Sequence, residues 1–126
     1  MGVVAVSPEP ASAALVRRSI AADLLGRQVA EDCVDNVVLV ASELVANAVV
    51  HAPAPDDAEL DVTWEVEPDC IVVEVLDSSP DLPRGRTTNP TDTRGRGLFI
   101  VASLALDWGV RRTRQGKQVW ARLPLH

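Results

Sequence analysis

The chain has 126 residues, of which 47% are hydrophobic and 24% are charged, and its formal net charge is −6. A globular domain of this length can bury a core of its own, and the acidic balance argues against a general affinity for nucleic acids or anionic lipids. No apolar run approaches the roughly 20 residues of a membrane span, and no basic region precedes an apolar core at the N-terminus. We therefore expect a cytoplasmic protein without a membrane segment.

The first part of the sequence predicts two helices. Apolar residues recur at helical spacing over residues 9–27, with Arg17, Arg18 and Asp23 on the other side. A second helix is predicted over residues 30–52, because acidic residues occupy its first turn and Pro53 follows its end. Before both helices, residues 2–6 have the pattern of a short edge strand.

The hydrophobic period then changes from the helical repeat to two. Leu60 to Val66 alternates apolar and polar residues, and Cys70 to Asp77 is the expected return strand of an antiparallel hairpin. Residues 78–96 lack apolar periodicity and are rich in Pro, Thr, Asp, Arg and Gly, which is typical of a functional loop or lid. A short helix over residues 97–106 and a second hairpin, residues 107–114 and 118–125 joined by residues 115–117, complete the prediction.

This order of elements predicts a single α+β domain over residues 1–126. We expect a two-layer sandwich, with helices packed on one face of a mostly antiparallel, mixed sheet. The two cysteines, Cys33 and Cys70, have neither the spacing of a zinc site nor that of a redox pair. We expect both to be small buried hydrophobes in a reducing cytoplasm.

The second predicted helix carries a polar stripe. Glu43, Asn47 and His51 are spaced four residues apart and therefore share one helix face. Such a stripe is either a solvated face or the lining of a cavity, and these residues alone do not separate the two. His51, at the helix end, could contact a lid or a phosphate, or could simply interact favourably with the helix dipole.

Two further segments favour a binding site. Asp77 ends an apolar strand, where its carboxylate could accept hydrogen bonds from an amino group or could simply begin a turn. Gly95 and Gly97 precede the third predicted helix, and glycines there allow close backbone approach to a phosphate.

In order and spacing, the segments ELVANAVVHA, VVEVLDSSPDLP and RGRGLFIVASLALDWGV resemble the GHKL ATP-binding superfamily. This superfamily includes DNA gyrase, heat-shock chaperones, sensor histidine kinases and bacterial anti-sigma factors with serine kinase activity. The short chain most resembles the anti-sigma branch, particularly its actinobacterial regulators. The resemblance implies the Bergerat-type ATP-binding fold, with ATP and Mg²⁺ as cofactors.

The resemblance also implies a role for single residues. Asn47 matches the magnesium ligand, Glu43 the acidic residue that polarises the attacking hydroxyl, and Asp77 the acceptor of the adenine amino group. Backbone amides of the glycine box would hold the phosphates. Gly95 and Gly97 match this box, and we expect the nucleotide-binding residues in and around it to be Arg84, Arg94, Gly95, Arg96, Gly97 and Leu98.

The sequence departs from the superfamily pattern at two places. Asp77 is followed by Ser78, Ser79 and Pro80, where the superfamily has glycines, and the glycine box has no third glycine. Arginines near these two places could compensate for the missing glycines by pairing with the nucleotide phosphates. The arginines in question are Arg84, Arg86, Arg94 and Arg96, and they could equally be solvated loop residues.

Two functions follow from these observations. In the first, the protein is a cytoplasmic ATP-binding regulator that binds a sigma factor, an anti-anti-sigma protein or both, and phosphorylates Ser or Thr of its antagonist. The resemblance suggests a homodimer, which the sequence itself leaves open. In the second, the protein is a non-catalytic module that sequesters a partner and binds nucleotide weakly or not at all. A sensor histidine kinase is disfavoured, because the chain has no dimerisation helix with a phosphoacceptor His. A transcription factor is also disfavoured, because the chain is acidic and its sequence shows no DNA-recognition helix.

Overall fold

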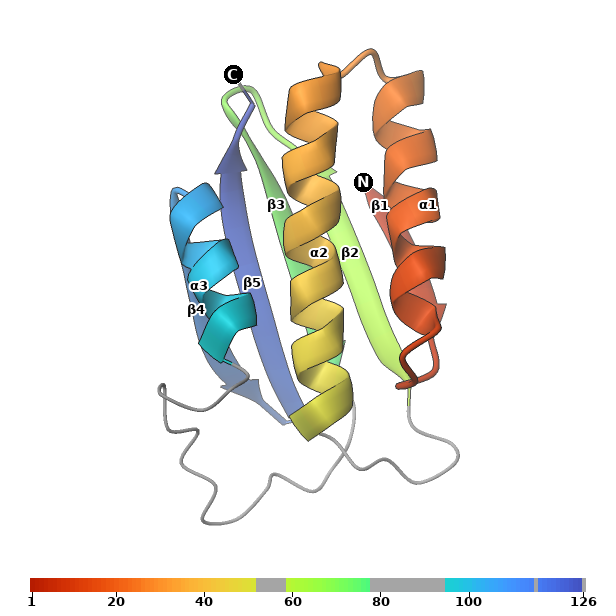
Figure 1. Ribbon diagram of the computed structural model, residues 1–126, viewed down its shortest axis with the longest axis vertical. Coiled ribbons are helices and arrows are strands. Elements are labelled where there is room, and N and C mark those ends of the chain that lie inside the picture. The colour runs from red at the N-terminus through yellow and green to blue at the C-terminus, as the bar shows by residue number, and fades with distance from the viewer. Residues whose placement is uncertain (52–58, 78–94, 115, 126) are drawn as a thin grey trace.

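The computed structural model describes residues 1–51, 59–77, 95–114 and 116–125. Its elements, in chain order, are β1 (Gly2–Val6), α1 (Ser12–Gly26), α2 (Glu31–His51), β2 (Leu60–Val66), β3 (Cys70–Asp77), α3 (Gly95–Leu104), β4 (Asp107–Thr113) and β5 (Gly116–Pro124). The strands form one five-stranded sheet in the order β1-β2-β3-β5-β4 (Figure 1). All four pairings are antiparallel, so the sheet is not the mixed one expected.

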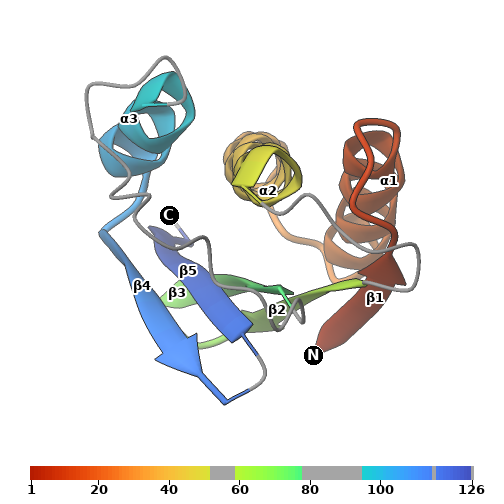
Figure 2. The same cartoon turned by 90° about the horizontal axis from the view of Figure 1, so that it is seen from below.

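The three helices lie on one face of this sheet (Figure 2). The central helix, α2, packs between α1 and α3 and contacts both β3 and β5. The buried side chains of α2, such as Leu44, pack in one core with inward-facing strand residues such as Val73 and Val119. The α+β architecture with helices on one face of the sheet is therefore confirmed.

Helix α1 is shorter than predicted. It begins at Ser12 rather than at residue 9, because Pro8 to Ala11 form turns whose backbone groups pair locally, including Ser12 N–H donating to the Glu9 carbonyl. The hydroxyl of Ser12 also donates to the carbonyl of Ser7 at 2.6 Å. At the other end Gln28 has a positive φ of 64°, which turns the chain from α1 towards α2.

Two boundaries differ from the prediction in ways that concern the candidate site. Helix α3 begins at Gly95, so Gly95 and Arg96 belong to its first turn rather than to the preceding irregular stretch, and it ends at Leu104. The sequence hides this start, because apolar periodicity begins only at Leu98 and a first turn needs no intrahelical acceptors for its N–H groups. Strand β5 likewise begins at Gly116, which pairs with Thr113, so Lys117 lies within the sheet and not in the turn.

Both cysteines are buried and free, as expected. Burial raises the pKa of each thiol, and the nearby Glu67 adds to this effect at Cys70. In the part of the chain that the structure describes, no helix is both long enough and apolar enough to cross a membrane.

Candidate functional site

The polar stripe of α2 lies at the edge of the helix's buried face. Glu43 and Asn47 are half-buried, between the fully buried Val40 and Leu44 on one side and the exposed Leu39 on the other. His51 is the last residue of α2, and its side chain lies outside the described structure. The stripe is therefore neither a freely solvated surface nor part of the apolar core.

The side-chain oxygen of Asn47 is the most informative atom of the stripe. Oδ1 of Asn47 is buried, and it accepts no hydrogen bond from any residue that the structure describes. A buried acceptor without a donor costs roughly 1–3 kcal/mol, so such atoms are rare in folded proteins. An unpaired amide oxygen at this position is a ready ligand for a hard cation such as Mg²⁺.

Asp77 is buried at the C-terminal end of β3, with a relative exposure of 8%. Its side chain faces the helices, because residues two apart share a sheet face and Val73 and Val75 are buried on that side. The last turn of α2, the first turn of α3 and the end of β3 all lie at the same end of the molecule (Figure 1). Asn47 and Asp77 thus belong to one end of the helix-covered face.

A row of charged residues crosses three strands beside Asp77. Lys117 of β5 lies directly opposite Asp77, and Arg112 of β4 lies directly opposite Lys117. Burial lowers the pKa of Lys117, and the charge of Arg112 adds to this effect while that of Asp77 opposes it. Sequence analysis missed both cations, although Lys117 could have been found by its place two residues before the inward-facing Val119.

The first turn of α3 contributes backbone donors at the same end. Gly95, Arg96 and Gly97 form this turn, whose N–H groups have no acceptor within the helix and can bind an anion. The side chains of Arg96 and Leu98 are outside the described structure, as are Arg84, Arg86 and Arg94 entirely. Their predicted roles therefore stay predictions.

Residues 6–123 match the family model described as the histidine kinase-like ATPase domain. The chain belongs to this family. Membership indicates that it binds ATP and agrees with the GHKL resemblance of its three motifs. Among curated proteins, none matches the chain.

The fold of this ATPase domain is also similar to that of the histidine kinase domain from the Erythrobacter litoralis EL346 blue-light activated histidine kinase, with a TM-score of 0.58. The sequence identity is 23%, and the match covers 74% of this chain but 45% of that one. The present chain therefore spans less than half the length of that protein, and the likeness concerns the fold.

In this ATPase domain, the described residues suit a magnesium nucleotide. The buried, unpaired Oδ1 of Asn47 has the chemistry of a magnesium ligand, because Mg²⁺ prefers oxygen donors together with phosphate oxygens and water. The carboxylate of Asp77 is able to accept a hydrogen bond from an amino group, and the N–H groups at the start of α3 are able to bind phosphate oxygens. These three contributions come from different elements that meet at one end of the fold.

Proposed function

We propose that the chain is a cytoplasmic anti-sigma regulator that binds Mg-ATP at this end of α2 and phosphorylates a Ser or Thr of an antagonist protein. The observation that carries the nucleotide part is the buried, unpaired Oδ1 of Asn47. The regulatory part rests on the resemblance of the three sequence motifs to the anti-sigma branch.

In this proposal Asn47 is a magnesium ligand, and the cation neutralises charge on the nucleotide phosphates. Asp77 accepts a hydrogen bond from the adenine amino group. The backbone amides of Gly95 and Gly97 bind phosphate oxygens, supported by the arginines around the glycine box.

Glu43 is the proposed catalytic residue. It lies one helical turn before Asn47 on the same stripe, so it can orient an acceptor hydroxyl next to the bound phosphates. The hydroxyl oxygen bonds to the γ-phosphorus, the bond to the β–γ bridging oxygen breaks, and the hydroxyl proton passes to the carboxylate. Positioning and charge neutralisation carry such reactions, because the protein performs little covalent chemistry itself.

The proposed partners are a sigma factor, an anti-anti-sigma protein or both, with a second copy of the chain completing a homodimer. The whole chain, residues 1–126, serves as one ATP-binding domain. The non-catalytic module remains the competing function, and it shares the protein partner but not the phosphoryl transfer.

Asn47→Ala tests nucleotide binding directly. We expect calorimetry to show Mg-dependent ATP binding to the wild type and a loss of affinity of about tenfold or more in the variant. The free energy of unfolding should not fall by more than about 1 kcal/mol, because removing an unpaired buried acceptor offsets the lost packing. Asn36→Ala, an exposed asparagine on the same helix, is the matched control and should change neither quantity.

Glu43→Gln separates the two functions. Phosphoryl transfer to the antagonist should collapse while ATP and partner binding survive, because the variant keeps the size and polarity of the side chain but loses the base. Wild-type protein that binds its partner but no ATP at millimolar concentration would refute the kinase and leave the sequestering module.

A further inference from the structure

Asp77 and Lys117 form a directly opposed pair on adjacent strands. They are register partners in the antiparallel pairing of β3 with β5, so their Cβ atoms are about 4.5–5.5 Å apart. Both side chains face the helices, because Asp77 continues the inward series of Val73 and Val75, and Lys117 that of Val119 and Ala121. A carboxylate and an ammonium group thus lie side by side at the candidate nucleotide site.

The ammonium group of Lys117 has N–H donors that no described residue uses. Lys117 is half-buried, and within the described part of the chain its Nζ makes no hydrogen bond or close ion pair. The lowered pKa of Lys117 reflects the cost of withdrawing this cation from water. A half-buried ammonium group with three donors is stabilised by an acceptor that arrives with a ligand.

Adenine carries a matching pair of groups along one edge. Its 6-amino group is a donor, and the neighbouring ring nitrogen N1 is an acceptor. Guanine presents the reverse order, with a carbonyl acceptor at position 6 and an N–H donor at N1. A carboxylate beside an ammonium group on adjacent, paired strands can therefore read the adenine edge through two adjacent contacts.

We propose that Lys117 is a second base-reading residue, which donates a hydrogen bond to adenine N1 while Asp77 accepts one from the 6-amino group. This inference rests on the proposed ATP binding and assigns part of the base specificity to a strand residue that no sequence motif indicated. Arg112, the next residue in the row, lies two strands from Asp77, about 10 Å away, and is exposed, so it is not assigned to the base.

The test compares ATP with 1-deaza-ATP, in which N1 is replaced by C–H, in calorimetric titrations with Mg²⁺. The wild type should bind 1-deaza-ATP about fivefold to tenfold more weakly than ATP, because one hydrogen bond from a charged donor is lost. Lys117→Met, which keeps most of the side-chain volume without the donor, should lose a similar factor for ATP and no longer discriminate between the two nucleotides. Arg112→Gln removes the neighbouring cation and should keep the discrimination.

Two results would overturn the inference alone, and a third would refute it together with the proposed function. Equal wild-type affinity for the two nucleotides would remove Lys117 from base recognition and leave ATP binding itself intact. If Lys117→Met lost the same factor of affinity for ATP and for 1-deaza-ATP, the lysine would act on the phosphates or on the stability of the fold. Thermal unfolding of the variant without nucleotide separates these two roles. A wild type that binds neither nucleotide would instead refute the proposed function, and this inference with it.

Discussion

The carboxylate of Asp23 joins α1 to the sheet. It accepts a hydrogen bond from the indole Nε1 of Trp64 on β2 at 2.8 Å and pairs with Arg27 at 3.1 Å. Gly2 of β1 lies against the same indole ring, where a larger residue would clash. The hydrogen bond from Trp64 is the main cause that lowers the pKa of Asp23 below its ordinary value of 3.8.

Asp23→Asn should therefore destabilise the protein in a pH-dependent way. A lowered folded-state pKa means that the ionised carboxylate stabilises the fold above pH 3.8, and this contribution disappears as the pH falls through the lowered pKa. At pH 7 we expect the variant to lose about 1 kcal/mol in urea denaturation, since a charge-assisted bond becomes a neutral one. The difference from wild type should vanish well below pH 3.8.

Asp35→Asn serves as the control for this pH series, because Asp35 is an exposed aspartate on α2. A difference for Asp23→Asn that stayed constant from pH 7 to strongly acidic conditions would contradict the explanation based on ionisation.

Helix α2 covers the middle of the sheet and packs against both α1 and α3, so its buried side chains should contribute most to stability among the described helices. Its buried face includes Leu44, which is fully buried, whereas Leu39 on the same helix is 41% exposed. We expect Leu44→Ala to lower the free energy of unfolding by roughly 2–5 kcal/mol, because it leaves a cavity between α2 and the strands.

Leu39→Ala makes the same chemical change on the other face of α2 and should cost less than about 1 kcal/mol. Urea denaturation of both variants measures the difference. Equal losses would mean that α2 does not pack as the structure has it.

At the level of elements, the sequence predicted those parts whose pattern is local. The helical spacing of α2 and the alternation of β2 and β3 placed these elements within one or two residues of their observed bounds. The start of α3 was missed, because Gly95 and Arg96 carry no apolar signal. Lys117 was assigned to a turn, because only the pairing of Gly116 with Thr113 reveals how short that turn is.

The candidate site was predictable only in its single components. Glu43, Asn47 and Asp77 were found by spacing and by resemblance. The C-terminal ends of α2 and β3 lie at one end of the fold (Figure 1), while the roles of the three residues stay predictions. Neither the unpaired Oδ1 of Asn47 nor the opposition of Asp77 and Lys117 can be read from the sequence, because burial and strand register arise from tertiary packing.

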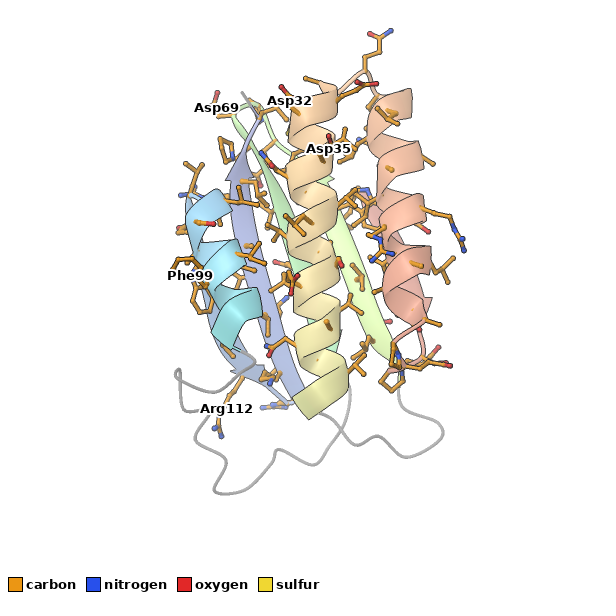
Figure 3. The ribbon with its side chains drawn as sticks, in the orientation of Figure 1. Asp32, Asp35, Asp69, Phe99 and Arg112 are labelled. Carbon is orange, nitrogen blue, oxygen red and sulfur yellow. The ribbon has the colours of Figure 1, made fainter. Side chains whose placement is uncertain are left out.

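Across the whole molecule, the described charges are unevenly distributed. Asp32, Asp35 and Asp69 lie at one end, and Arg112 lies at the other, where the candidate site is (Figure 3). Asp69 precedes β3 and Asp77 ends it, so about 25 Å of strand separates the two, well beyond the Debye length of about 8 Å at physiological salt. An anionic ligand approaching the site therefore meets the nearby cations Lys117 and Arg112 and the nearby carboxylates Glu59, Asp61 and Asp77, while the distant aspartates are screened.

The association rate of ATP should consequently depend on salt. We expect stopped-flow measurements to show a decrease of roughly tenfold between 0.01 and 1 M ionic strength. Arg112→Gln should slow association at low salt and flatten this dependence. Asp69→Asn removes one negative charge at the far end and should leave the rate unchanged. If Asp69→Asn sped association as much as Arg112→Gln slowed it, only the net charge would matter.

The strand order also has a consequence for synthesis on the ribosome. β3 lies in the middle of the sheet, yet its second neighbour, β5, is translated last, after residue 115. At a translation rate of roughly 5–20 residues per second, the edge of β3 stays unpaired for several seconds before β5 is made, and the apolar residues Ile71, Val73 and Val75 lack part of their packing during that time. Chains interrupted between residues 77 and 116 should therefore aggregate or recruit chaperones rather than persist as smaller folded units.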